Sequence, residues 1–344
     1  MILFLLIISC GTPALTQETK QQYKIGCLAF WNFENLFDLE DDPTINDDDF
    51  TPEGSLRWTA EKYAEKMGHL ADVISEIGTE LNPDGAALLG VSEIENRKVL
   101  EDLVKEKKIL ARDYKIVHFD SPDRRGIDVG LLYQEKYFKP HRSTIIPFDL
   151  IKENGDTVFT RDILMVQGMF DGEDLTVLVN HWPSRRGGEA ASRYLREHSA
   201  SHCKRIIDSL EQQNPAAKIV IMGDLNDDPV SSSLKNILKA RGKSHKVKEG
   251  ETFNPMFSYF KKGIGTTAWR DAWSLFDQIV LSRGFISKDN KGYQFYQARI
   301  HNPRYLVQKT GRYQGYPFRT FAGGSYVGGY SDHYAVYAYL VKPI

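Results

Sequence analysis

Short apolar runs separated by polar or glycine-containing turns recur along most of the chain. Runs of this length, rich in β-branched and aromatic residues, are typical of β-strands. The expected strands are residues 23–31, 86–91, 114–118, 129–133, 158–168, 175–180, 218–222, 276–281 and 334–340.

Three other segments have helical patterning. Between residues 58 and 78, the apolar residues Tyr63, Met67, Leu70, Ile74 and Ile77 step by three and four, which predicts an amphipathic helix. We expect a long helix over 189–210 and a shorter one over 232–240. Strands outnumber helices and arrive partly as hairpins, partly with helices between them. This order favours an α/β (α+β) fold in which two mixed sheets pack together and are covered by helices. Because no stretch resembles a linker or a repeat, residues 23–344 are predicted to form a single domain.

The N-terminus has the pattern of an export signal. Residues 1–8 are apolar but too few to span a bilayer, which takes about 20 residues. Residues 7–10 (Ile-Ile-Ser-Cys) resemble a bacterial lipoprotein box, so we predict a signal peptide over 1–9, lipid attachment at Cys10 and a polar tether over 10–22. The alternative is a buried first strand. The protein is therefore expected to be exported, as a membrane-anchored lipoprotein in the periplasm or at the cell surface, or else secreted.

The composition gives no overall sign of nucleic-acid binding, and it excludes a disulfide-stabilised scaffold. The 44 Lys and Arg residues nearly balance the 46 Asp and Glu residues, so net charge gives no sign of nucleic-acid binding and any such binding needs local evidence. Three cysteines cannot form a disulfide scaffold. Cys27, within an apolar run, is interpreted as a small core residue. The acidic residues between Asp38 and Asp49 lack the spacing of a calcium loop and are interpreted as a solvated loop.

Polar residues stand at the ends of six expected strands, where packing gives no reason for them. Each alone would be interpreted as a turn residue or a helix cap. Together they form a set of carboxylates, amides and histidines at positions where loops present functional groups on a rigid scaffold. The set is Asn32, Glu93, His181, Asp224 with Asn226, Asp277, and Asp332 with His333.

This set suits hydrolysis of a phosphate ester. Oxygen ligands without cysteine favour Mg²⁺, with Mn²⁺ or Ca²⁺ as alternatives. The phosphate is anionic, so a site must neutralise charge and orient a water molecule. A His–Asp pair can move protons near neutral pH.

The same residues, in this order, resemble those of the endonuclease/exonuclease/phosphatase superfamily, from about residue 23 to the C-terminus. The motifs are Asn32 in WNFENLF, Glu93 in LLGVSEIEN, His181 in VLVNHWPSRR, GDLN at 223–226, Asp277, and SDH at 331–333. The resemblance implies a four-layer sandwich, with two sheets flanked by helices, a site at one end of both sheets and a monomeric protein.

The resemblance also implies roles for these residues. Glu93 would be the chief metal ligand, with Asn32 beside it and Asp332 assisting directly or through water. Asp224 would position the attacking water, and Asn226 would hold the phosphate. His333, oriented by Asp277, would act as a general base or stabilise the phosphate. His181 would contact the phosphate or protonate the leaving oxygen.

Three arginines are weaker candidates for substrate binding. Guanidinium groups suit phosphate because they offer paired donors. Arg125 stands in DRRGIDVGLLY, which resembles the family's substrate-side strand, and Arg161 precedes a strand. Arg185, with Arg186, follows His181 and could line the rim. For Arg125 and Arg161 the alternative is a surface salt bridge.

The substrate is narrowed but not fixed by the sequence. Asp227 and Asp228 follow GDLN where the family's inositol phosphatases carry Tyr-Arg, which disfavours that branch. The aromatic segment 253–260 could be a lipid-contacting hairpin, although core packing is favoured. The basic segment 235–248 could contact a phosphate backbone or be a solvated face. We expect an exported endonuclease acting on DNA or RNA, whose only membrane contact is a lipid anchor. The alternatives are a lipid or small-molecule phosphoesterase and an inactive binding module.

Overall fold

The computed structural model describes residues 21–152, 155–287 and 292–344. The predicted signal peptide, Cys10 and most of the predicted tether lie outside the described residues. No helix in the described part of the chain is long and apolar enough to cross a membrane.

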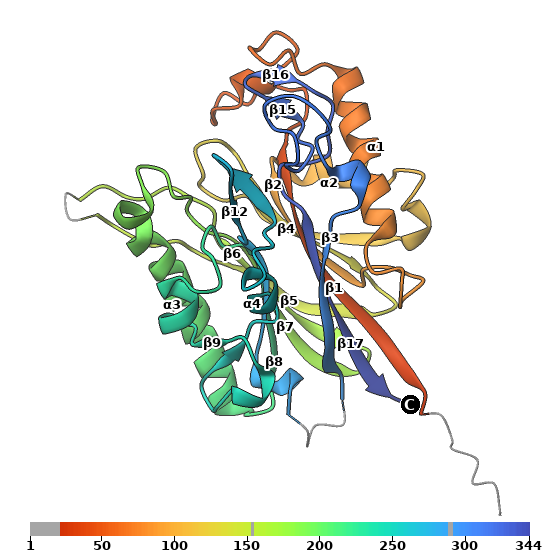
Figure 1. Cartoon of the computed structure of the whole chain (residues 1–344), viewed down its shortest axis with the longest axis vertical. Helices are drawn as coiled ribbons and strands as arrows, with labels where there is room; N and C mark the ends of the chain where they lie inside the picture. The colour runs from red at the N-terminus through yellow and green to blue at the C-terminus, as the bar shows by residue number, and fades with distance from the viewer. Residues whose placement is uncertain (1–20, 153–154, 288–291) are drawn as a thin grey trace, which may run out of the picture.

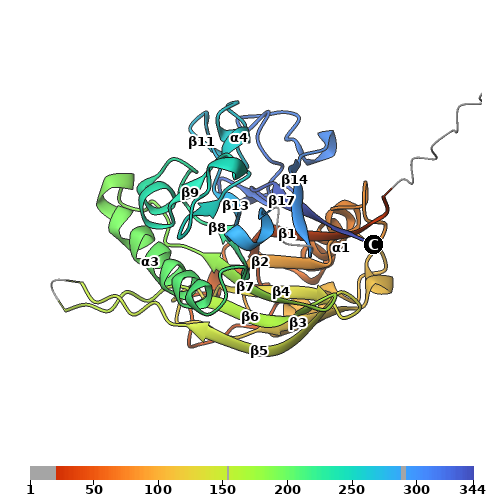
Figure 2. The ribbon, with the colours of Figure 1, turned by 90° about the horizontal axis from the view of Figure 1, so that it is seen from below.

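Two large mixed sheets form the centre of the molecule (Figures 1 and 2). The first has six strands, in the order β14 (Gln294–His301), β17 (Ala335–Pro343), β1 (Tyr23–Leu36), β2 (Leu88–Ile94), β4 (Asp128–Gln134) and β3 (Tyr114–His118). The second has seven, in the order β5 (Phe138–Ile146), β6 (Ile163–Phe170), β7 (Glu173–His181), β8 (Lys218–Asp224), β13 (Asp277–Leu281), β10 (Thr252–Phe253) and β9 (Ala240–Arg241).

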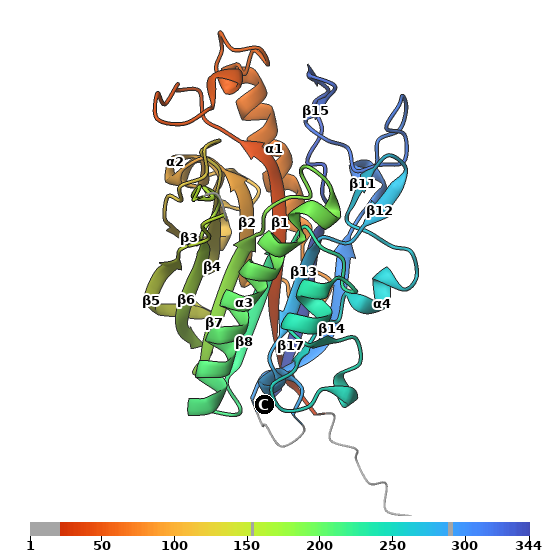
Figure 3. The same cartoon turned by 90° about the vertical axis from the view of Figure 1, so that its left-hand side faces the viewer.

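Helices cover the outer faces of both sheets, which gives the four layers expected from the sequence (Figure 3). Helices α1 (Ala60–Glu76) and α2 (Arg97–Leu103) pack on the first sheet, and α3 (Glu189–Gln213) packs on the second. A smaller helix and two hairpins lie at the periphery. They are α4 (Phe257–Phe260), β11–β12 (Thr267–Trp269, Ala272–Ser274) and β15–β16 (Phe321–Ala322, Ser325–Tyr326).

The alternation of side chains along β1 explains why the sheets pack this way. Leu28 and Phe30 join the core between the two sheets, whereas Ala29 and Trp31 join the core under α1. Because successive side chains point to opposite faces, a strand that is apolar at every position must be buried on both faces. A third core lies between α3 and the second sheet and contains Cys203.

Several expectations from the sequence need correction. The strand expected over 158–168 begins only at Ile163, because Val158 instead donates its amide to the Leu150 carbonyl in a hairpin. The helix expected over 232–240 is a five-residue π-helical turn, Ser233–Ile237. Strands β5 and β14 were not anticipated, since their polar, alternating sequences are half exposed.

Other expectations are confirmed or refined. Phe253 and Met256 are buried between the sheets, so the aromatic segment 253–260 packs in the core and is no free lipid-contacting hairpin. Cys27 is a buried free thiol. The acidic loop is solvated only in part: Asp38 and Asp47 are buried, and the Asp38 carboxylate accepts from the Asn96 amide at 3.1 Å.

Strand directions determine where the polar residues collect. β1 runs parallel to β2, and β7 runs parallel to β8, while β13 and β17 run antiparallel to their partners. The carboxyl ends of the first four strands therefore meet the amino ends of the last two at one end of the molecule.

Gly223, the residue before Asp224, allows β7 and β8 to lie in close register. A Cβ atom at this position would lie 2.2 Å from the carbonyl oxygen of Asn180. We predict that Gly223→Ala lowers the free energy of unfolding by about 3 kcal/mol, the upper end for overpacking, because backbone must move. Gly68→Ala in α1 is the matched control, since no atom lies within 4 Å of its Cβ; it should stabilise by about 0.5–1 kcal/mol. Urea titration measures both, and equal effects would contradict the prediction.

Candidate active site

Strand pairing in the second sheet sets three of the predicted side chains next to one another. His181 at the end of β7 is in register with Asp224 at the end of β8, and Asp224 is in register with Asp277 at the start of β13. All three are almost fully buried. The backbone ladder therefore fixes their order across the sheet before any side-chain contact is made.

The backbone of the first sheet is irregular where it positions Asn32 and Glu93 at the site. The β1–β2 register shifts between Asn32 and Leu36, and Glu34 and Asn35 adopt left-handed φ values of 52° and 53°. Glu93 is also left-handed, at φ 57°. Its Oε2 atom accepts the Asn35 amide at 3.0 Å. Non-glycine residues in this region cost about 1–3 kcal/mol each and persist where the surroundings enforce them.

A buried hydrogen bond joins the two sheets at the site. The Asn32 side-chain amide donates to Asp224 Oδ2 at 3.2 Å, and the Asn226 backbone amide donates to Asp224 Oδ1 at 2.9 Å. The Asn226 side chain donates to the Trp182 carbonyl at 3.0 Å. The Asp224 carboxylate is thus held by one residue from each sheet.

His333 forms the predicted pair with Asp277. Its Nδ1 atom lies 2.7 Å from Asp277 Oδ2, and its Nε2 atom faces Asp224 Oδ2 at 3.9 Å and Asp332 Oδ1 at 4.0 Å. Burial alone would lower the pKa of His333, but the carboxylates of Asp277 and Asp224 hold that pKa well above its usual value. These carboxylates therefore favour the protonated, positively charged form of the imidazole.

His181, in contrast, is held in its neutral form. Its Nε2 atom lies 3.7 Å from Asp224 Oδ2 and 3.8 Å from Glu93 Oε1. Burial, reinforced by the positive charge of Arg161, holds the pKa of His181 well below its usual value. The site therefore carries one neutral and one charged imidazole around the same Asp224 carboxylate.

The donor set fits a divalent metal ion. Asp224 and Asp277 offer carboxylate oxygens within 4.8 Å of each other and of the His333 ring. Glu93 Oε1 lies 3.8 Å from His181 Nε2, and Asp332 Oδ1 lies 4.0 Å from His333 Nε2. Burial and the nearby Asp277 carboxylate raise the pKa of Asp224 to about 7. Crowded carboxylates of this kind are stabilised by a cation, and oxygen ligands suit a hard one.

A second charged layer lies behind these ligands. Glu34 accepts the Thr320 amide at 2.6 Å, and the fully buried Lys66 ammonium of α1 donates to the Tyr330 carbonyl at 2.7 Å. Burial lowers the pKa of Lys66 to about 8, and the same burial raises the pKa of Glu34 to about 7. This pair links α1 to the loop that leads into Asp332 and was missed from the sequence, where Lys66 looks like any polar helical residue.

The three predicted arginines lie in different environments. Arg161 is buried, paired with Asp123 at 2.9 Å, and donates to the carbonyls of His181 and Trp182 at 3.2 and 2.8 Å. Arg125 is half exposed and lines a cleft at the site. Arg185 donates to the Asn226 carbonyl at 2.9 Å and pairs with Asp228 at 3.1 Å, whereas its neighbour Arg186 lines the cleft.

The cleft that contains the site has a volume of about 540 Å³. Its wall includes Arg124 and Phe159, and the Arg124 guanidinium lies 5.2 Å from the centre of the Phe159 ring. The Phe159 side chain is 48% exposed. Glu93, His181, Asp224, Asn226 and His333 form the floor. Phe159 and Arg124 gave no sequence signal, because their place in the cleft depends on the hairpin before β6.

Arg196 of α3 was also missed from the sequence. Its fully buried guanidinium donates to Asp227 Oδ1 at 2.7 Å, directly after the GDLN segment. A fully buried arginine on a helix that packs on a sheet needs a carboxylate partner. In the sequence, the only indication of this contact was the adjacent pair Asp227-Asp228, whose carboxylates could pair with a buried arginine.

Substitution of Asp123 tests whether the buried Arg161–Asp123 ion pair stabilises the structure around the site. We predict that Asp123→Asn lowers the free energy of unfolding by about 3–5 kcal/mol, because it leaves the Arg161 charge buried and unpaired. The control Asp120→Asn removes a carboxylate that is 90% exposed, and it should change stability by less than about 0.5 kcal/mol. Chemical denaturation measures both. A small effect of Asp123→Asn would mean that Arg161 does not depend on this carboxylate.

Solved structures of low sequence identity share this fold. TDP2 of D. rerio with 14 humanizing mutations is 14% identical, with a TM-score of 0.54 over 92% of this chain and 98% of that one. A mannosyl-6-phosphatase of Bacteroides thetaiotaomicron is 15% identical, with a TM-score of 0.54 over 93% and 99%. An endonuclease/exonuclease/phosphatase of Bacteroides vulgatus is 13% identical, with a TM-score of 0.54 over 92% and 98%.

Comparison with curated protein sequences finds no match. The model of the endonuclease/exonuclease/phosphatase family, however, matches residues 27–342, which include all or most of every strand of the two large sheets. The charge-neutralising donor set and the paired histidines are the chemistry that such a hydrolase requires. The chain belongs to the endonuclease/exonuclease/phosphatase family and is a phosphoesterase.

Proposed function

We propose that this phosphoesterase is an exported endonuclease that cleaves phosphodiester bonds in DNA or RNA with the help of Mg²⁺. The observation that carries the proposal is the cleft, which combines the acid–base residues with exposed arginines and an exposed aromatic ring. Arginines suit the phosphate backbone, and every nucleobase offers a face that can stack on an aromatic side chain. A small phosphate ester would need no stacking surface.

The metal would be held by oxygen atoms of Glu93, Asp332 and Asn32, and when bound it would neutralise the phosphate charge. Glu93 and Asn32 lie near the carboxyl ends of β2 and β1, which pair in parallel in the first sheet, and Asp332 lies in the loop before β17. This arrangement agrees with the roles that the sequence motifs imply.

The remaining residues handle protons and orientation. Asp224 is placed to accept a proton from the attacking water, since both of its oxygens already receive hydrogen bonds that fix its direction. The charged His333, fixed through Nδ1 by Asp277, is suited to stabilise the phosphate by donating from Nε2. Neutral His181 is suited to a hydrogen bond with a phosphate or leaving-group oxygen.

A lipid or small-molecule phosphoesterase is the second candidate. The β11–β12 hairpin exposes Trp269, 70% accessible, and Trp273, 39% accessible. An exposed pair of this kind is suited to contact a lipid surface, and one structural neighbour is named as a mannosyl-6-phosphatase. Assays on both substrate classes therefore accompany the nuclease assay.

Export and lipid attachment at Cys10 stay predictions from the sequence. Mass spectrometry of the mature N-terminus after expression in a bacterial host tests them. Retention of residues 1–9 would contradict both.

Nicking of supercoiled plasmid tests the nuclease proposal. We expect cleavage with Mg²⁺ that EDTA abolishes, and Asp277→Asn should lower kcat by about 10²–10⁴, since it removes the charge that orients and charges His333. The control Asp174→Asn changes an exposed carboxylate near the opposite end of β7 and should have no effect. Intact plasmid, together with hydrolysis of sphingomyelin vesicles or sugar phosphates, would replace the nuclease by the second candidate.

The Phe159 side chain supplies a more specific test. We predict that Phe159→Ala raises KM for a single-stranded oligonucleotide by about 5–100-fold, because stacking of one base contributes about 1–3 kcal/mol. It should leave the hydrolysis of glycerophosphocholine, a phosphodiester with no ring that could stack, nearly unchanged. A control, Phe119→Ala, removes a ring that is 40% exposed and is not among the residues that line the cleft. Equal loss on both substrates would show that Phe159 only supports the fold.

A further inference from the structure

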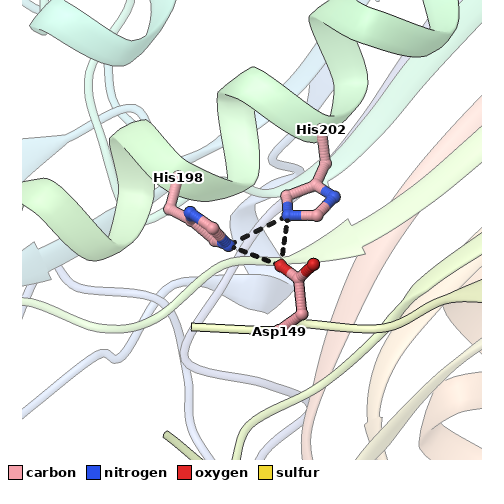
Figure 4. A group of neighbouring side chains, drawn as sticks. All are labelled: Asp149, His198 and His202. Atoms are coloured by element: carbon pink, nitrogen blue, oxygen red, sulfur yellow. Dashed lines mark hydrogen bonds and ion pairs between the residues drawn. The ribbon is translucent and has the colours of Figure 1, made fainter. Parts of the chain in front are cut away.

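Three side chains converge at the surface of α3, apart from the active-site residues (Figure 4). His198 and His202 are one helical turn apart on α3, and Asp149 follows β5. Asp149 Oδ1 lies 3.0 Å from Nε2 of each histidine, and the two Nε2 atoms are 2.9 Å apart. Residues at positions i and i+4 share one face of a helix, which is why the two imidazoles can meet.

The triangle formed by these atoms has the dimensions of a metal-binding face. A divalent ion about 2.0–2.1 Å from each atom would bind them at mutual angles near 90°, which are the angles of one face of an octahedral site. Asp149 is 65% exposed and His198 is 26% exposed, so solvent can supply the remaining ligands. His202 is 6% exposed and anchors the face to the protein.

The contacts within the cluster identify the two Nε2 atoms as the ligating atoms. Each Nε2 atom is 3.0 Å from Asp149 Oδ1, so protons on these nitrogens make the hydrogen bonds that hold the three side chains together. A metal ion binds the deprotonated nitrogen, and the proton then resides on Nδ1. The exposed Arg205 side chain, whose Nη2 atom lies 2.8 Å from His202 Nδ1, would turn towards solvent in that state.

We propose that Asp149, His198 and His202 form a second metal site, which binds a divalent transition metal ion. Two imidazoles and one carboxylate favour an ion of this type. The active site offers mainly carboxylate and amide oxygens, which favour Mg²⁺. The two sites are thus distinguished by ligand chemistry, and the second does not depend on which phosphoester is cleaved.

The position of the site gives it a structural consequence. Asp149 begins the hairpin whose return segment carries Val158, Phe159 and Thr160 into the cleft wall. On the helix side, Leu195 lines the same cleft one turn before His198. Phe148 packs edge-on against the His198 ring at 5.0 Å between centroids. A bound ion would therefore fasten the hairpin to α3 and fix the position of this wall.

Titration of the metal-free full chain with Co²⁺ in excess Mg²⁺ tests the proposal. We expect one Co²⁺ per chain with visible d–d absorption, which Zn²⁺ displaces. The signal should persist in Glu93→Gln, which impairs only the catalytic metal site. His202→Ala and Asp149→Asn should each weaken Co²⁺ binding by more than about 100-fold. Loss of a residue that only forms a hydrogen bond with a metal ligand already weakens binding by about 10–100-fold, and these changes remove a ligand itself.

Controls separate this site from casual binding by surface histidines. His245→Ala removes an exposed histidine outside the cluster and should leave the Co²⁺ spectrum unchanged. Because His202 is nearly buried, Asp149→Asn and His198→Ala serve as the variants least able to disturb folding, which circular dichroism checks. No Co²⁺ signal, or a signal that survives all three changes, would overturn the proposal.

A second readout follows the hairpin itself. Zn²⁺ should raise the melting temperature and slow proteolysis between residues 147 and 160 in the wild type but not in Asp149→Asn. Metal binding that leaves proteolysis unchanged would refute the fastening of the wall to α3. Neither measurement uses catalytic activity, so failure of the nuclease assay would not affect the result.

Discussion

The buried Asp224 carboxylate is the group on which the rest of the site depends. It receives hydrogen bonds from Asn32 of the first sheet and from the Asn226 backbone of the second, and both histidines face it. A carboxylate without water is costly unless its oxygens are paired. The apolar core between the two sheets brings Asn32 close enough to satisfy this group, and Gly223 allows the local register by leaving room for the Asn180 carbonyl.

The other neighbours of each ring explain why one imidazole is charged and the other is neutral, although both face Asp224. His333 has Asp277 within 2.7 Å as well as Asp224 nearby, whereas His181 has Arg161 behind its backbone and its Nδ1 atom has no hydrogen-bond partner among the described residues. Neighbouring charge decides the outcome, since both rings are buried. His181, at the end of β7, thus provides a neutral ring that can form hydrogen bonds. His333, before β17, provides a cation, although both residues are histidines.

The sequence predicts the floor of the site better than its walls. The residues of the floor lie at or near the ends of strands whose apolar runs are clear in the sequence, so both the strands and their polar ends could be found. They are Asn32, Glu93, His181, Asp224, Asp277 and His333. Phe159, Lys66 and Arg196 could not, because their roles arise where a hairpin or helix meets a distant segment. The half-exposed strands β5 and β14 were missed for a related reason: a polar alternating strand has a weak signal until its partner is known.

Helix α3 connects the floor of the site to its walls. Its buried Arg196 binds Asp227, next to Asn226, while Leu195, the adjacent residue, reaches the cleft wall. His198 and His202 continue along the helix towards Asp149 at the base of the hairpin. A displacement of α3 would therefore move the phosphate side and the Phe159 side of the cleft together. A firm connection between the hairpin and α3 would therefore hold the two sides of the cleft at a fixed separation.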